Sequence, residues 1–286
     1  VIGGVLVQSL GWRSIFYVNV PIGIFVVTLV TLKLKETRTR SASEGFDLAG
    51  ALMLSGFLAL FLVALTLGAN LGWSSAPILS MLLLSGGMFL TFLFIESRLS
   101  RHPTLELSLF TRNRLFAAAN IAALLSYVAI TGVTFVLSIY LQDVQGLDPQ
   151  TAGLFIITMS TAMALLSPVS GWLSDRFGSR LPSSAGMLVV TVGLLLMSRL
   201  NATSSAPDIV SRLALLGVGF GLFSSPNTSA VMGSVDRRKL GLAAGTLGTM
   251  RFMGQSIGLA LVGAVIATAL PPQTMLQLFT GLSAHD

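Results

Sequence analysis

The chain has 286 residues, of which 53% are hydrophobic and 10% are charged, whereas about a quarter of the residues in a soluble domain are charged. This composition excludes an ordinary soluble domain and predicts an integral membrane protein. Its formal net charge of +6 comes from basic clusters between apolar runs, which indicates membrane topology rather than nucleic-acid binding. Cysteine is absent, which excludes disulfides and cysteine-ligated metals.

Eight apolar stretches are long enough to cross a bilayer, which takes about 20 helical residues. Residues 1–10 are apolar but too short for a span, so we expect them to end a helix whose beginning is absent from a fragment. The predicted fold class is an all-α integral membrane bundle with about eight full transmembrane helices and a partial one. The full spans cover 16–34, 48–71, 78–95, 117–141, 153–173, 181–200, 209–232 and 242–270.

Basic residues gather in every second loop, as the positive-inside rule expects of cytoplasmic loops. The opposite side holds Arg13, Arg199 and Arg212, while Arg251 lies inside a predicted span. The turn at 171–180 is therefore predicted to be cytoplasmic. The predicted cytoplasmic loops hold 13 of the 17 basic residues, namely Lys33, Lys35, Arg38, Arg40, Arg98, Arg101, Arg112, Arg114, Arg176, Arg180, Arg237, Arg238 and Lys239.

A polar turn with a regular pattern separates the spans 153–173 and 181–200. We expect its first glycine to allow close approach of a neighbouring helix and Gly178 to supply a positive φ. Asp175 is predicted to lie near the start of the next helix or to pair with Arg176 or Arg180. Each position alone fits a basic connector equally well, but the whole pattern favours a motif. It comprises Gly171, Leu173, Asp175, Arg176, Gly178 and Arg180.

Arg251 is the one ionisable residue inside a predicted span. A central arginine costs about 2.5–3.5 kcal/mol on insertion scales, so a role is expected for it. At helical spacing it shares a face with Gly248, Gln255 and Gly258, which suits the bundle interior. Arg251 and Gln255 are therefore candidates for the pathway wall or for locking a helix pair. A structural arginine that binds backbone carbonyls or snorkels to the cytoplasmic surface fits equally well.

Further polar residues fall within or beside the spans and could bind substrate. Asn120 and Tyr127 share one span, Asn227 follows Ser225 and Pro226 on another, and Gln142 lies at an outer span end. Each alone is more typical of interhelical hydrogen bonds, which contribute about 0.6 kcal/mol. The phenylalanines and methionines, including Phe220, Phe223 and Met232, are interpreted as lipid-facing or core residues rather than an aromatic drug site.

Several chemistries lack the residues they need. Every carboxylate lies in a loop or at a span end, and the two histidines, His102 and His285, are in polar segments. No metal site, enzyme centre or P-loop is therefore predicted. The glycine pairs Gly241/Gly245 and Gly254/Gly258 are predicted to pack helices together.

The motif at 171–180 resembles the signature loop of the major facilitator superfamily. A second set of residues, which we call the span-opening motif, is similar to the fifth and sixth spans of the fourteen-span drug:proton antiporter branch. This branch also has a motif in its fifth span, of which this chain contains only the final glycines, Gly3 and Gly4. The resemblance to the branch continues along the chain as far as Arg251. The span-opening motif comprises Trp12, Arg13, Asn19, Pro21 and Gly23.

The resemblance implies a division of the chain, with the first spans and the last one absent. Residues 1–34 would end the N-terminal bundle, and 117–270 would supply five spans of the C-terminal bundle. The resemblance implies two inserted transmembrane helices at 48–95. The charge pattern predicts cytoplasmic linkers at 35–47 and 96–116 and an outward-facing tail at 271–286.

The function implied is secondary active transport by alternating access, as proton-coupled export of hydrophobic drugs or toxic compounds, cationic ones included. The expected partners are this substrate and the lipid bilayer, with no nucleic acid and no cofactor beyond the proton gradient. A multi-pass protein of the bacterial inner membrane is expected, with the 171–180 motif in its cytoplasmic gate. The alternatives are a same-fold transporter of a metabolite or siderophore, a non-transporting membrane protein and an inactive fragment.

Overall fold

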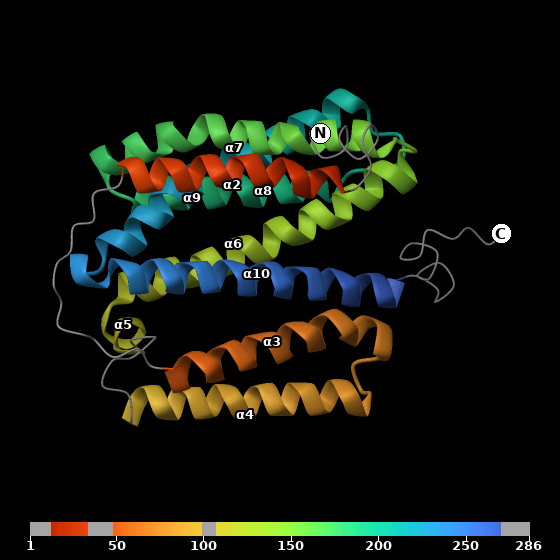
Figure 1. Cartoon of the computed structure of the whole chain (residues 1–286). Helices are drawn as coiled ribbons and strands as arrows, with labels where there is room; N and C mark the ends of the chain where they lie inside the picture. The colour runs from red at the N-terminus through yellow and green to blue at the C-terminus, as the bar shows by residue number, and fades with distance from the viewer. Residues whose placement is uncertain (1–12, 34–47, 99–106, 270–286) are drawn as a thin grey trace.

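A computed structural model describes residues 13–33, 48–98 and 107–269, and all regular structure in these ranges is helical (Figure 1). Eight of these helices are long and apolar enough to span a membrane, which confirms the predicted fold class. Trp12, residues 1–10, the linker 35–47 and the tail 271–286 lie outside the described residues. The long helices are α2 (Ser14–Lys33), α3 (Leu48–Leu71), α4 (Ala76–Arg98), α6 (Arg114–Ile139), α7 (Pro149–Phe177), α8 (Arg180–Met197), α9 (Ala206–Gly233) and α10 (Leu240–Ala269).

Three short elements lie at the ends of the long helices. The helix α5 (Leu107–Arg112) falls inside the predicted linker 96–116, and a 3-10 turn, η2 (Arg237–Lys239), precedes α10. A π-helical turn, η1 (Tyr140–Val144), extends α6. Such turns leave the regular α-helical hydrogen-bond ladder and are frequent at functional sites.

Successive long helices run in opposite directions, so their ends collect on two faces of the bundle (Figure 1). On the left of that view lie the last residues of α2, α4, α7 and α9 and the first residues of α3, α6, α8 and α10. Lys33, Arg114, Arg176, Arg180 and the basic η2 turn belong to these ends. By the positive-inside rule this face is predicted to be cytoplasmic.

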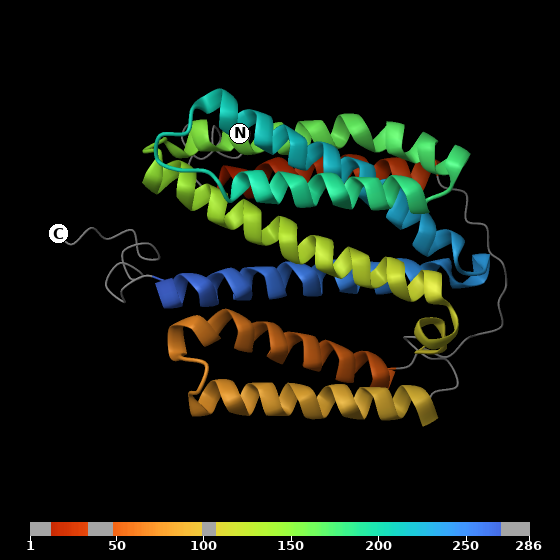
Figure 2. The ribbon, with the colours of Figure 1, turned by 180° about the vertical axis from the view of Figure 1, so that it is seen from behind.

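The long helices other than α2 pack as two groups. α7 and α8 both lie against α9, whereas α6 lies mainly against α10, and α10 also touches the hairpin of α3 and α4 (Figures 1 and 2). Contacts between the α7–α8–α9 group and the α6–α10 pair are few. We call this boundary the seam.

Glycines set the close approach within each group. A Cβ atom on Gly186 of α8 would lie 2.7 Å from the carbonyl oxygen of Gly219 on α9, so only hydrogen fits there. Gly254 and Gly258 of α10 likewise lie against the backbone of α6 at Leu124 and Val128, which confirms that this pair packs helices. The corresponding prediction for Gly241/Gly245 is wrong within the described residues, because no neighbouring atom lies within 4 Å of a Cβ built on either glycine.

Two apolar clusters lie in the seam, one toward each end. The outer cluster joins Leu137 and Leu141 to Met159, Val190, Ile209, Leu213, Leu216 and Phe220. The inner cluster, nearer the basic face, joins Phe116, Ala119 and Ala123 of α6 to Ala230 and Val231 of α9 and to Ala243 and Leu247 of α10. The stretch of the seam between these clusters is where a polar pathway could lie.

α2 carries the described part of the span-opening motif. Arg13, Asn19, Pro21 and Gly23 are all exposed, and so is nearly every other described side chain of this helix. No neighbouring atom lies within 4 Å of a Cβ built on Gly23. The role of this motif stays a prediction.

Candidate functional site

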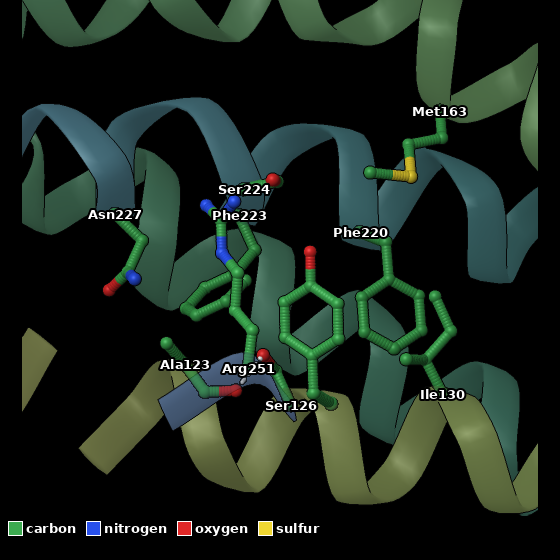
Figure 3. Close-up of a pocket in the computed structure, with 10 residues that line it drawn as sticks. Ala123, Ser126, Ile130, Met163, Phe220, Phe223, Ser224, Asn227 and Arg251 are labelled. Carbon is green, nitrogen blue, oxygen red and sulfur yellow. Dashed lines mark hydrogen bonds between the residues drawn. The ribbon is translucent and has the colours of Figure 1, made fainter. Parts of the chain in front are cut away.

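A small cavity lies in the seam, between the inner and outer clusters (Figure 3). Its volume is about 20 Å³, which is room for a single water molecule or an oxygen-sized group. α6, α7, α9 and α10 all contribute to its wall. The lining residues are Ala123, Ser126, Tyr127, Ile130, Met163, Phe220, Phe223, Ser224, Asn227 and Arg251.

The cavity lies near the middle of the membrane. Arg251 stands about 17 Å along α10 from Leu240, and Tyr127 about 20 Å along α6 from Arg114, at a rise of 1.5 Å per residue. The hydrocarbon core of a bilayer is about 30 Å thick. Both side chains are therefore far from either surface of the membrane.

Arg251 spans the seam, extending from α10 toward α9 (Figure 3). Its Nη2 donates a hydrogen bond of 2.8 Å to Thr228 Oγ1 on α9. Its guanidinium carbon lies 5.6 Å from the ring centroid of Tyr127 on α6, within the range of a cation–π contact. Its Nε is buried and has no hydrogen-bond partner. Arg251 thus touches both sides of the seam and keeps one buried donor unused.

The face predicted for Arg251 is divided in the structure. Gly258 packs on the backbone of α6 at Val128, whereas a Cβ on Gly248 would meet no atom within 4 Å. Gln255 is half-buried and is not among the residues that line the cavity. Of the predicted face, Arg251 lines the cavity and Gly258 packs on α6, whereas Gln255 does not line the cavity.

The structure brings together three of the six predicted pathway residues, Tyr127, Asn227 and Arg251. Asn120 is fully buried nearer the inner cluster and donates through Nδ2 to the carbonyl oxygen of Phe116 at 2.9 Å. Gln142 belongs to η1 at the outer end, where its Nε2 lies 2.9 Å from Ser138 Oγ. Asn120 and Gln142 are therefore separate from the cavity.

Phe220 and Phe223 are only 4% exposed and belong to the core, as interpreted, and they also line the cavity. Ser224 lines it as well. Together with Asn227 these residues follow the spacing i, i+3, i+4, i+7, which places them on one face of α9. That spacing could have marked a common wall, but only the packing of α6 and α10 shows that it surrounds a cavity.

At the outer end, hydrogen bonds join η1 and the residue after it to the loop between α8 and α9. Tyr140 Oη donates to the carbonyl oxygen of Asn201 at 2.7 Å. Gln145 Nε2 donates to Tyr140 Oη, also at 2.7 Å. These contacts cross the seam beside η1 and support the outer cluster.

The motif at 171–180 is mostly helical rather than a polar turn. α7 continues through Phe177, so the connection to α8 consists of Gly178 and Ser179 alone. Gly178 has φ +81°, which confirms the predicted positive φ. A Cβ on Gly171 would lie 3.2 Å from the Ser225 side-chain Oγ of α9, and no neighbouring backbone atom of the described residues lies within 4 Å, so close approach of a neighbouring backbone stays a prediction. Leu173 lies on the same last turns of α7.

Asp175 differs from the prediction in its ion pairs. It is exposed in the last turn of α7, at the carbonyl end of that helix. Among the described residues it forms no ion pair with Arg176 or Arg180. The Arg176 guanidinium carbon instead lies 5.5 Å from the ring of Trp172. The predicted ion pair is therefore wrong within the described part of the chain, whereas a position of Asp175 near the start of α8 stays a prediction.

The comparisons with known proteins decide the family. A family model described as the Major Facilitator Superfamily matches residues 1–259. The chain belongs to the major facilitator superfamily. It is 35% identical to the multidrug resistance protein Stp of Mycobacterium tuberculosis over 94% of this chain and 49% of that protein. This major facilitator chain is also 30% identical to the tetracenomycin C resistance and export protein of Streptomyces glaucescens, over 94% and 49% of the two chains.

A further relative is named as the riboflavin transporter RibZ of Clostridioides difficile, with 30% identity over 94% of this chain and 58% of that protein. The major facilitator chain therefore spans about half the length of the curated relatives it matches. Together with the eight apolar helices, the family identifies a multi-pass protein of the bacterial cell membrane.

Within the described residues of this major facilitator chain, no group of three or more histidine, cysteine, aspartate or glutamate side chains could hold a metal. None of the described carboxylates lines the cavity. Glu96 is buried, at 7% exposure, but lies in the last turn of α4. Arg251 is thus the one charged side chain in the wall of the cavity.

Proposed function

We propose that this chain forms the C-terminal part of a fourteen-span exporter that moves hydrophobic compounds by alternating access. The observation that carries the proposal is the cavity around Arg251, Tyr127 and Asn227. It lies at mid-membrane in the seam, with an apolar cluster on either side. Separating one cluster at a time would open the cavity to one side of the membrane and then to the other, which is the requirement of alternating access.

The direction of transport is proposed from the relatives named for multidrug resistance and for export. We propose proton coupling as the energy source and no cofactor or enzymatic step. Because no described carboxylate lines the cavity, we place the coupling carboxylate in the length of the relatives that this chain does not cover. A raised carboxylate pKa at membrane depth would let such a group bind and release the proton.

A transporter of an aromatic metabolite is the second candidate, because one relative is named as a riboflavin transporter. Tyr127, Phe220 and Phe223 line the cavity, and opening of the seam would expose these rings to a flat metabolite as well as to a drug. Uptake of labelled metabolite into vesicles, compared with export of drugs from cells, separates these two functions.

The signature motif is proposed to act in the cytoplasmic gate. We predict that Asp175→Asn in the full-length protein lowers dye export at least about tenfold, the effect of about 1.4 kcal/mol, while expression is retained. Asp236→Asn is the matched control, since Asp236 is also exposed at the basic face. The measurements are efflux of a cationic dye, ethidium, and of an anionic dye, fluorescein, from cells, and proton flux in inverted vesicles with a pH-sensitive acridine dye. Equal export by both variants would remove Asp175 from the gate.

A further inference from the structure

We infer that the cavity takes an anionic oxygen of an aromatic substrate, such as a carboxylate, phenolate or enolate, and that Arg251 Nε donates to it. This inference rests on the proposed transport function and narrows its substrate class. It replaces the expectation that cations are among the substrates. The following observations on charge, donors, aromatic surface and size lead to it.

The cavity has an unbalanced positive charge. Within the described residues, the contacts of the Arg251 guanidinium are the neutral Thr228 hydroxyl and the neutral Tyr127 ring, and no carboxylate lines the cavity. At membrane depth the surroundings screen this charge far less than water would. An anion is therefore attracted to this wall and a cation is repelled from it.

One donor at the cavity lacks an acceptor. Arg251 Nε is buried and has no hydrogen-bond partner. A buried donor without a partner destabilises a structure. Asn227 and Ser224 also line the cavity, and their side chains can donate to a bound oxygen. An oxygen that accepts from Arg251 Nε is thus the group that the cavity lacks.

Aromatic rings surround these donors. Phe220 and Phe223 of α9 and Tyr127 of α6 line the same cavity as Arg251. Tyr127 is only half-buried, so its ring can contact a flat aromatic compound that lies beside the cavity. An aliphatic anion would use the charge but not this surface.

The volume sets which part of the substrate enters. About 20 Å³ holds one oxygen-sized group and excludes a whole drug molecule. The ring system of the substrate then stays outside the cavity, on the side where Arg251 is partly exposed. The cavity therefore selects substrates by their charged oxygen rather than by the size of the whole molecule.

The test compares two dyes with the same xanthene ring and opposite charge. Fluorescein is an anion, and tetramethylrhodamine methyl ester is a cation. Fluorescence polarisation measures the binding of each dye to purified full-length protein in detergent. We expect wild type to bind fluorescein at least about tenfold more tightly than the rhodamine, a difference of about 1.4 kcal/mol. The wild-type comparison needs no variant and so does not depend on how a variant folds.

Variants test whether Arg251 causes the preference for fluorescein over the rhodamine. Arg251→Gln is expected to abolish it, Arg251→Lys to keep part of it, and Arg199→Gln, which changes an exposed arginine at the outer face, to leave it intact. Equal or tighter rhodamine binding by wild type would overturn the inference, as would a preference that survives in Arg251→Gln. Equal or tighter rhodamine binding would result if a carboxylate elsewhere in the same protein neutralised Arg251.

The export assay distinguishes failure of this inference from failure of the proposed function. Export of cationic dyes without preferential fluorescein binding supports the transport proposal and overturns the anion site. Preferential fluorescein binding without export of any dye supports the anion site and contradicts the exporter.

Discussion

At the residue scale, the sequence marked Arg251 but not what surrounds it. A lone arginine in an apolar span is evident from composition, because its burial is costly. Its neighbours Tyr127 and Thr228 come from two other helices, and the rotation of those helices is set by packing that the sequence pattern does not contain. The same reason explains why the core interpretation of Phe220 and Phe223 did not include their position in the cavity wall.

Gly186 offers a test of packing at a single residue. A Cβ there would lie 2.7 Å from both the Gly219 carbonyl oxygen and the Phe223 nitrogen, which are backbone atoms and cannot move alone. Gly186→Val is expected to destabilise the protein by about 1–3 kcal/mol through overpacking and to lower its Tm. Gly87→Val is the control, since no atom lies within 4 Å of a Cβ on Gly87. Equal melting of the two variants would show that α8 and α9 are not closely packed at Gly186.

At the scale of one element, hydropathy found every long helix but misplaced the ends of α7. The apolar run 153–173 is shorter than the helix, which covers Pro149–Phe177. The extra turns carry polar residues, so a search for apolar spans misses them. Capping residues could still have predicted both ends of the helix, because Asp148 and Pro149 are typical of a helix start and Gly178 of a helix end. The motif at 171–180 was therefore predicted as a turn when most of it is helix.

The start of α7 is expected to depend on pH. Asp148 accepts hydrogen bonds from the hydroxyl and the backbone N–H of Thr151 at 2.6 and 2.9 Å. These bonds lower the pKa of Asp148 below its ordinary value of 3.8. The carboxylate therefore stabilises the folded state above that value, and this contribution is lost as the pH falls through the lowered pKa.

The corresponding experiment compares Asp148→Ala with wild type in thermal melting at neutral pH and at a pH well below 3.8. Asp148→Ala should have a lower Tm at neutral pH, and the difference should shrink in acid. Asp148→Asn keeps a capping side chain without the charge, so its Tm should lack this pH dependence. A difference between Asp148→Ala and wild type that persists unchanged in acid would contradict the role of the carboxylate.

At the scale of the whole molecule, the described long helices other than α2 form two bodies that meet along the seam. The number of spans followed from their length and hydropathy, and the direction of each span followed from charge. The division into α7–α8–α9 and α6–α10 did not, because every apolar helix has several possible neighbours. Glycine contacts such as Gly186 with Gly219 fix this choice, and a sequence that shows many glycines does not show which of them face a helix.

Motion along the seam can be measured because the chain has no cysteine, so introduced cysteines carry spin labels without interference. We predict that a pair at Leu195 and Val265, on α8 and α10, changes its distance distribution when substrate is added. A pair at Leu195 and Val210, both in the α7–α8–α9 group, should keep its distribution. All three positions are exposed. Changes of equal size in both pairs would mean that the two bodies do not move as units.

The central position of α9 has a consequence for how the protein is made. α9 is less apolar than α7 and α8, and half of its spanning window is buried by protein, a larger share than in any other described helix. Because the ribosome synthesises α7 and α8 first, both surfaces that cover α9 are already in the membrane when it emerges. The glycines and polar side chains of α9 then meet these helices rather than lipid. Chain order thus supplies α9 with its partners at the moment of insertion.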